Sequence, residues 1–507
     1  FVAVLSFALM RLIGRSDVNE INVAATGMSA GAMVAGGLVF TLPGLFISGI
    51  WDLGQPGQTA GDFLKARLPL VLFVALAGVL LGTALCWLFR KRNIEDLNLP
   101  YPIGKAAAST LEAGKKGGSQ ALTLLVALLL AAGLTLLRDH FGLFPPLLAF
   151  SIAAFPLTFY MSPMAIGIGG LIGFSSTLYW LLGAAITSLA RFLILETSLL
   201  GSIPGAAEKL GEWNLTVAVA LMVGAGLGTL IAFLFGTYKK KGSRRSASSS
   251  SRRRLSAPRG MGLLSLILVA LAFVITLLTG MKVLPALLLM AGVFFAALLS
   301  SLITGQTGIN PMEIFGIIVL LAIRALVTVS PEHAFFIAAI VAVTCGYAGD
   351  MMNDYKSGAI LKTNPTAQFV IELVGGFFGA FTASIALLAI IYSRGGVGME
   401  VGLPAAQAHS VTAMVAGLGN PILFAIAALI GCALTLFLKI PAMIIGIGMM
   451  LTGAGLALPI FLGGLLEYLS RTHLKKDSQS AIQMGAAGLL GGEGIMGTLL
   501  AIIALFR

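Results

Sequence analysis

The stretch "LPLVLFVALAGVLLGTALCWLF", residues 68–89, is almost entirely apolar and contains no charged side chain. An α-helix needs about 20 such residues to cross the ~30 Å hydrocarbon core of a bilayer. Comparable runs recur along the whole chain. A membrane β-barrel is excluded, because its strands would alternate polar and apolar residues. We therefore predict an all-α, polytopic membrane protein.

The composition supports this prediction. Of the 507 residues, 58% are hydrophobic and 10% are charged, against about 25% charged residues in a soluble domain. The net charge of +12 does not indicate nucleic-acid binding, because Lys and Arg gather in one linker and at the ends of apolar runs, as in membrane proteins. The expected partner is the lipid bilayer, and the expected location is the cytoplasmic membrane, crossed many times.

We expect about fifteen transmembrane helices in this chain. The apolar runs are residues 1–13, 23–50, 68–89, 121–137, 144–160, 165–189, 215–235, 261–279, 284–303, 314–329, 334–347, 369–392, 422–438, 442–465 and 484–505. Residues 102–113 and 404–416 are too short to span, and we expect re-entrant or broken helices there, which are tolerated where protein covers their backbone. The chain starts inside an apolar run, so we expect a preceding helix and a parent protein with sixteen.

A basic linker, "KKKGSRRSASSSSRRRLSAPR" (residues 239–259), divides the chain near its middle. Its Ser- and Arg-rich composition predicts disorder, and its charge places it on the cytoplasmic side. Residues 1–238 and 260–507 then form two transmembrane halves. Counting spans back from the linker puts Arg11, Arg15, residues 90–92 and Lys105 on the cytoplasmic side as well.

The two halves resemble each other weakly. "IGIG" follows a proline at residues 166–169 and again at 445–448. "YPIGKAAASTLEAG" (101–114) is echoed by "LPAAQAHSVTAMVAG" (403–417), and "GLGTL" (226–230) by "IMGTL" (495–499). Three matches in the same order indicate internal duplication, which is common in secondary transporters. The sequence does not decide between parallel and inverted repeats.

Charged and amide side chains between membrane-length runs are the candidate functional residues. Asp350 and Asp354 lie four residues apart and share one face of a helix. Two carboxylates this close repel each other when both are ionised, which makes one a candidate proton acceptor. Lys356 could neutralise one of them instead. The alternative interpretation is a solvated cytoplasmic turn that ends at Asn364 and Pro365.

Two further polar segments carry candidates. "ITGQTGINPMEIFG" (303–316), with Asn310 and Glu313, is either a broken helix that offers groups to a substrate or a short loop. "RSDVNEINVAATG" (15–27) contains Glu20, Asn22 and Thr26, and Asp17 or Asn19 could simply cap a helix there.

Glu372 and Glu493 are lone carboxylates inside apolar or Gly-rich runs. Ionisable residues at membrane depth are functional candidates by default. We expect Arg324 to be the buried partner of one of them.

Several classes of site have no support. The three cysteines show no CxxC spacing and the four histidines are scattered, so we predict neither a disulfide framework nor a metal site. The sequence contains no P-loop, no GxSxG or HExxH motif, and no TVGYG-like filter. We assign no catalytic residue and no cofactor.

The polar segments together resemble the oligopeptide transporter (OPT) family, which includes the yellow-stripe-like metal-chelate transporters. "GDMMNDYKSGAILKTNPTAQ" (349–368) is similar to the family signature at Asp350, Asp354, Lys356, Gly358, Pro365 and Gln368. Residues 19–45 match at Glu20, Asn22, Thr26, Phe40 and Pro43, and residues 97–114, 162–173 and 491–502 also fit. The Asn-Pro-Gly and Lys-Ile-Pro-Pro-Arg motifs of the fungal and plant peptide-transporting branch are absent, so the chain is more similar to the prokaryotic branch.

The resemblance implies a secondary active, proton-coupled importer of small oligopeptides or peptide-like metal chelates. Asp350, Asp354 and Glu20 would bind protons or ammonium groups, Lys356 a substrate carboxylate, and Asn310, Asn22 and Gln368 would donate or accept neutral hydrogen bonds. The alternatives are a membrane enzyme acting on a lipid-linked substrate, and a passive channel or permease subunit. The sequence leaves the oligomeric state open, a homo-oligomer included.

Overall fold

A computed structural model describes residues 2–53, 59–114, 119–152, 155–196, 206–234, 260–308, 310, 312–398, 401, 403, 405–416, 420–450, 455–473 and 476–505. Most of these residues are helical, and ten helical segments among them are long and apolar enough to cross a membrane. The predicted all-α, polytopic class is confirmed. Other predicted spans form shorter helices, such as Pro163–Ile172 and Pro421–Leu436, whose ends must be covered by neighbouring protein.

The helices before the linker are α1 (Val2–Leu12), α2 (Val18–Val39), α3 (Gly44–Ile47), α4 (Ala60–Arg90), α5 (Pro102–Gly114), α6 (Ser119–Thr135), α7 (Pro163–Ile172), α8 (Phe174–Arg191) and α9 (Ala206–Leu234). Those after it are α10 (Met261–Leu278), α11 (Val283–Thr307), α12 (Met312–Leu326), α13 (Pro331–Gly346), α14 (Met352–Leu361), α15 (Pro365–Arg394), α16 (Ala406–Ala416), α17 (Pro421–Leu436), α18 (Ala442–Met450), α19 (Ala457–His473) and α20 (Lys476–Leu505). Four π-helical turns are η1 (Lys91–Asp96), η2 (Leu136–His140), η3 (Phe192–Glu196) and η4 (Tyr347–Met351).

Polar residues at the helix starts cap the free backbone amides. Asp17 accepts a hydrogen bond from the Asn19 amide at 3.0 Å and caps α2, as one of the two sequence interpretations proposed. Asn364 caps α15 in the same way, with Pro365 at the first helical position. These caps fix where the chain enters each helix.

Residues 144–160 do not form a membrane helix, and that prediction is wrong. They contain an antiparallel hairpin of β1 (Leu147–Ile152) and β2 (Phe155–Tyr160). Proline explains the difference, because Pro146 and Pro156 lack the amide donor that a helix needs and clash with its preceding turn. The Tyr160 amide donates instead to the Gly455 carbonyl at 3.0 Å.

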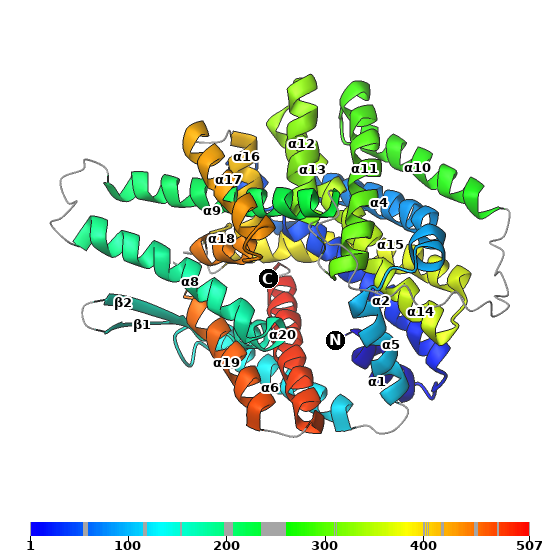
Figure 1. Ribbon diagram of the computed structural model, residues 1–507, viewed down its shortest axis with the longest axis horizontal. Helices are drawn as coiled ribbons and strands as arrows, with labels where there is room; N and C mark the ends of the chain where they lie inside the picture. Colours follow the sequence, from blue (N-terminus) through cyan, green and yellow to red (C-terminus); the bar gives the residue numbers. More distant parts are fainter. Residues whose placement is uncertain are drawn as a thin grey trace.

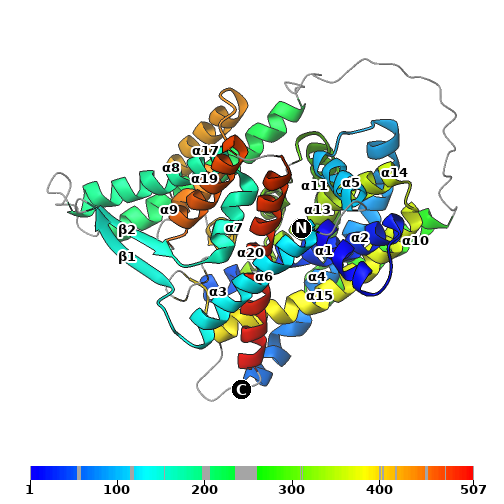
Figure 2. The ribbon, with the colours of Figure 1, turned by 90° about the horizontal axis from the view of Figure 1, so that it is seen from below.

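The helices form two groups (Figure 1, Figure 2). The first group contains α1–α5 and α10–α15, and the second contains α6–α9, α17–α20 and the β-hairpin. Each group therefore combines helices from both sides of the linker. α16 packs against both groups.

Packing in the first group reveals how the two sets of helices are related. Gly37 lies against Val343 and Met33 against Gly346, so α2 and α13 are antiparallel. Ring contacts of Phe63 with Tyr392 (5.1 Å) and of Trp87 with Phe369 (5.2 Å) show that α4 and α15 are antiparallel as well.

The pairs α2–α15 and α4–α13 run parallel instead. Gly27 lies against Ile371 and Gly31 against Gly379, whereas Gly78 lies against Val343 and Gly82 against Tyr347. The pair α2–α15 is therefore equivalent to the pair α13–α4. The equivalent helices α2 and α13 run in opposite directions. This is an inverted repeat, the arrangement typical of many transporters.

The second group obeys the same relation. α6 packs along α20, and α17 packs along α9; α7 packs on α19 and α20, and α18 packs on α8 and α9. The three sequence echoes fall on equivalent helices, namely α5 with α16, α7 with α18 and α9 with α20. The predicted internal repeat is therefore confirmed, and the structure adds that it is inverted.

The two repeats are not packed identically. α16 packs on α9 and α18 of the second group, and α15 packs on α20. In the described part of the chain, the equivalent α5 does not pack in this way on α20 or α7, nor α4 on α9. The two groups are thus joined by α15 and α16 at the end of the molecule where α15 finishes, whereas at the end where α14 finishes they are joined through α1, which packs on α6.

Close helix contact in the first group requires glycine at Gly375, because a Cβ there would overlap the Gly27 carbonyl. We expect Gly375→Val to destabilise the protein by about 1–3 kcal/mol or more through overpacking. Thermal unfolding of purified protein in detergent, followed by size-exclusion chromatography, measures this. Gly133→Val is the matched control, because a Cβ at Gly133 would meet nothing within 4 Å. Equal stability of the two variants would contradict the packing described.

Candidate functional site

Among the candidate membrane spans in the described part of the chain, the segment that runs through α13, η4 and α14 is the most buried. Asp350 and Asp354 are exceptions, because both are partly accessible while residues 351–353 and 355–358 between and after them are buried. The two carboxylates lie on one helical face, as their spacing predicted. That face is therefore partly accessible, although the segment around it is buried.

Asp350 is held by an amide from the neighbouring helices. Asn310 Nδ2 donates to Asp350 Oδ2 and to the Cys345 carbonyl, both at 2.9 Å. Ser300 Oγ donates to Asn310 Oδ1 at 2.6 Å and fixes the orientation of the amide. Asn310 lies between α11, which ends at the left-handed Gly308, and α12.

Asp354 has an incomplete set of partners. Its Oδ2 is buried and has no hydrogen-bond partner among the described residues, and Ser29 of α2 lies beside the carboxylate. Asp350 is close enough to interact electrostatically with both Asp354 and Glu313. None of these three carboxylates forms an ion pair within the described part of the chain. A cluster of this kind can bind protons or the ammonium group of a substrate.

Lys356 lies on the side of α14 that faces α5. Its Nζ donates to Asn98 Oδ1 at 2.9 Å, and Lys105 of α5 is close enough to repel it. In the described structure Lys356 neutralises neither Asp350 nor Asp354. Its ammonium group is bonded to a neutral amide, which leaves its charge available to a substrate carboxylate.

Gln368, Asn22 and Thr26 form a buried network that positions α14. Gln368 Nε2 donates to the Asp354 carbonyl at 2.8 Å and to Thr26 Oγ1 at 3.2 Å. Asn22 accepts from Ser357 Oγ at 2.9 Å and donates to Thr363 Oγ1 at 3.1 Å. The network joins α14 to α2 and α15. These three predicted residues therefore hold in place α14, the helix that carries Asp354.

Glu20 lies apart from the other candidates. Its side chain is 42% exposed and pairs with Arg15 at 3.1 Å at the start of α2. An exposed pair of this kind contributes little to stability, typically about 0–1 kcal/mol.

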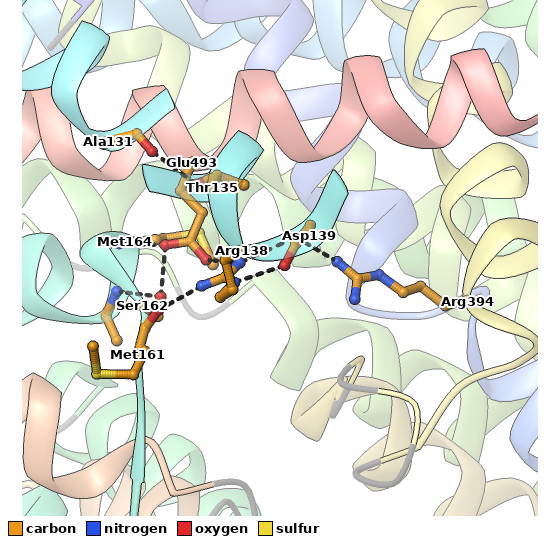
Figure 3. Close-up of polar contacts among 10 residues, drawn as sticks. Ala131, Thr135, Arg138, Asp139, Met161, Ser162, Met164, Arg394 and Glu493 are labelled. Carbon is orange, nitrogen blue, oxygen red and sulfur yellow. Dashed lines mark hydrogen bonds and ion pairs between the residues drawn. The ribbon is translucent and has the colours of Figure 1, made fainter. Parts of the chain in front are cut away.

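Glu493 lies in the second group of helices, in a buried cluster shown in Figure 3. It accepts hydrogen bonds from Arg138 NH2 at 2.9 Å, from Ser162 Oγ at 2.8 Å and from the Met164 amide at 2.7 Å. All of its acceptor positions point to groups at the ends of α6 and α7. Glu493 thus ties α20 to these two helices.

Arg324 is not the partner of either lone carboxylate, and that prediction is wrong. It donates to the backbone carbonyls of Met414 and Val415 at 3.1 and 2.8 Å. Arg138 takes the predicted role for Glu493, because η2 carries it to the end of α6, where α7 begins. Arg138 and Glu493 lie far apart in the chain, so no local sequence pattern predicts that they pair.

One ion pair joins the two groups of helices directly. Arg394 at the end of α15 contacts Asp139 at 3.1 Å, and Asp139 also pairs with Arg138 at 2.6 Å (Figure 3). A cavity of about 390 Å³ lies beside this pair, between His140, Ser393 and the last turns of α20. The pair lies at the joined end of the molecule.

An inverted repeat of membrane-length helices, with carboxylates and amides clustered at η4 and α14, is typical of membrane transporters. The family model for OPT oligopeptide transporter protein matches residues 1–190 and 240–504. The chain belongs to this family, which confirms the resemblance found in the sequence.

A protein of Haemophilus influenzae (strain ATCC 51907 / DSM 11121 / KW20 / Rd) named "Putative oligopeptide transporter" is similar to this chain. The two sequences are 25% identical over an alignment of 585 positions, which covers 99% of this chain and 89% of that protein. The family and this relative are transporters and not enzymes, so the membrane-enzyme alternative is set aside.

The contrast between Glu493 and Glu20 gives a testable difference. Glu493→Ala removes one of the two carboxylates that pair with Arg138, which is only 2% exposed, and breaking a buried pair costs up to about 3–5 kcal/mol. Glu20→Ala removes an exposed pair and should cost less than about 1 kcal/mol. Thermal or denaturant unfolding in detergent compares the two variants. A small effect of Glu493→Ala would show that the cluster does not hold α20 in place.

Proposed function

We propose that the protein is a secondary active, proton-coupled importer of small oligopeptides or peptide-like metal chelates in the cytoplasmic membrane. The observation that carries this proposal is the accessible face of Asp350 and Asp354 within a buried helix. Carboxylates kept at membrane depth without a cation are costly unless a proton or a charged substrate visits them.

The chemistry of the candidate groups suits a zwitterionic solute. Asp350, Asp354 and Glu313 would bind protons and the ammonium group of a peptide. Lys356 and Lys105 make the side between α14 and α5 electropositive, which would attract carboxylates. Asn310 supplies a neutral amide at the same depth, and its contact with Asp350 keeps that carboxylate oriented. Peptide-like chelates present the same carboxylate and amine groups, so both substrate classes remain in the proposal.

Transport would proceed by alternating access between the two groups of helices. In transporters built from inverted repeats, the two repeats exchange conformations as the site opens to one side and then to the other. The joined end, with α16 and the Arg394–Asp139 pair, would be the closed external side. The opposite end, beside α5 and α14, would be the side that opens toward the cytoplasm, where the basic linker is predicted to lie.

An inward proton gradient would supply the driving force, about 2.3 kcal/mol per charge for each 100 mV of membrane potential. In proteoliposomes, we expect saturable uptake of labelled di- to hexapeptides, or of iron or nickel chelates, that an inward proton gradient accelerates at least about tenfold. Asp354→Asn should abolish most of this acceleration, because it removes a proton-binding group. Uptake with and without the gradient is the measurement.

Glu20→Gln is the matched control for Asp354→Asn, because Glu20 lies in an exposed ion pair apart from the carboxylate cluster. Saturable turnover that ignores the gradient would count against symport. Substrate flux that shows no fixed ratio of substrate molecules to protons would favour the passive-channel alternative. Full coupled uptake by Asp354→Asn would remove that residue from the mechanism.

Cross-linking tests the alternating-access mechanism. Ser410 of α16 contacts Met222 of α9, with Oγ and Sδ 3.8 Å apart, at the joined end. In a Cys432→Ser background we expect Ser410→Cys/Met222→Cys, bridged by a short cleavable thiol reagent, to lose at least about 90% of uptake and to recover it on reduction. The bridge would prevent the joined end from opening.

Thr187→Cys/Asn214→Cys is the control pair. Thr187 Oγ1 on α8 and Asn214 Oδ1 on α9 lie 2.6 Å apart, and both helices belong to one group. The same reagent should leave its uptake unchanged. Normal uptake by the bridged α16–α9 protein would exclude movement at this contact.

A further inference from the structure

The core of the first group contains a carboxyl group that the proposed mechanism does not use. Glu372 of α15 is 0% exposed, although α15 crosses the full depth of the protein. Its neighbours are polar and equally buried, since Cys86 of α4, Tyr347 of η4 and Tyr355 of α14 are all at most 2% exposed. Four helical segments thus enclose a small polar compartment.

The hydrogen bonds in this compartment are incomplete. Tyr355 OH donates to Glu372 Oε2 at 2.8 Å, and the Cys86 thiol lies beside the carboxyl group. Glu372 Oε1 and the Tyr347 hydroxyl are buried and have no partner among the described residues. Buried polar atoms are rarely left unpaired, so each of these needs an explanation.

A proton on Glu372 Oε1 is one explanation for the unpaired carboxyl oxygen. The titratable or charged groups that face Glu372 are Cys86 and Arg90 from α4, Tyr347 from η4, and Asp354 and Tyr355 from α14. Arg90, the one cation of this set, pairs with Glu95 at 3.0 Å and stacks on Trp87. An ionised Glu372 would therefore be buried without its own counter-ion, which is costly, whereas the protonated acid carries no charge that needs one.

Asp354 connects this compartment with the accessible face. It interacts electrostatically with Glu372, and its neighbour Tyr355 donates the hydrogen bond to Glu372. Asp354 is partly accessible on one side, while its buried Oδ2 has no described partner. Because two nearby carboxylates cannot both be ionised cheaply, the charge on Asp354 governs whether Glu372 holds its proton.

We propose that Glu372 is the buried proton-binding residue of this transporter and that Asp354 is the group through which it exchanges its proton with the substrate pathway. The role in coupling rests on the proposed function, whereas the proton on Glu372 does not. An ammonium group bound at Asp354 would remove the repulsion between the two carboxylates. Movement of α14 would then carry Tyr355 and Asp354 relative to Glu372 and allow the proton to leave.

Infrared spectroscopy of the purified protein tests the proton directly. The difference spectrum of wild type minus Glu372→Gln should contain the C=O band of a protonated carboxylic acid with the small isotope shift expected in D₂O, because protons on Asp350, Asp354 or Glu313 contribute to both spectra. Glu467→Gln is the matched control, because Glu467 is also buried but pairs with Arg471 at 2.8 Å. A difference spectrum without this band would overturn the inference, whether or not the protein transports peptides.

Transport assays test the coupling. Glu372→Gln should lose at least about tenfold of gradient-driven accumulation yet keep exchange of labelled for unlabelled peptide within about twofold of wild type, and this exchange should no longer depend on pH. Undiminished gradient-driven accumulation in Glu372→Gln would overturn the coupling role. If wild type shows the acid band but no gradient-driven uptake, the proposed function fails and the proton site stands.

Tyr355→Phe covers the case in which Glu372→Gln does not fold. It removes one hydrogen bond while keeping the ring in its place beside Trp87. We expect the acid band to shift in frequency and the pH midpoint of exchange to move, with the amount of folded protein unchanged. An unshifted band would show that Tyr355 does not contact the protonated group and would contradict the proposal.

Discussion

Hydrocarbon offers no hydrogen-bond partner, so every polar group at membrane depth must be satisfied by the protein itself. The Arg138–Glu493 cluster and the Gln368 network meet this requirement completely, and both join helices from opposite sides of the linker. Glycines bring the backbones close enough for such contacts, as where Gly375 meets Gly27. Against this well-satisfied background the unpaired oxygens of Asp354 and Glu372 are conspicuous.

In the proposed alternating-access mechanism, the inverted repeat would give the molecule two conformations of similar energy. Equivalent helices can adopt each other's packing, so an arrangement that joins one end has a counterpart that joins the other. In the present arrangement α16 and the Arg394–Asp139 pair hold one end together. The carboxylates of η4 and α14 lie toward the other end, beside helices that make fewer contacts between the groups.

Much of the fold could be predicted from the sequence, because apolar length and glycine content report directly on membrane helices. The three short echoes between the halves located equivalent helices correctly. The hairpin at β1 and β2 was missed because its apolar length resembles a span, and the weight of Pro146 and Pro156 was underestimated. For the site, the spacing of Asp350 and Asp354 correctly gave a shared face. The contacts of Asn310 with Asp350, of Asn98 with Lys356 and of Arg138 with Glu493 could not be predicted, because only tertiary packing brings these residues together.

The interleaving of the two sets of helices has a consequence for biogenesis. The glycine face of α2 packs against α15, which the ribosome makes more than three hundred residues later. Early helices must therefore enter the bilayer and wait as loosely associated segments until late helices emerge. Lateral assembly after insertion, with the first segments shielded by lipid or by the insertion machinery, is the folding order that this topology imposes.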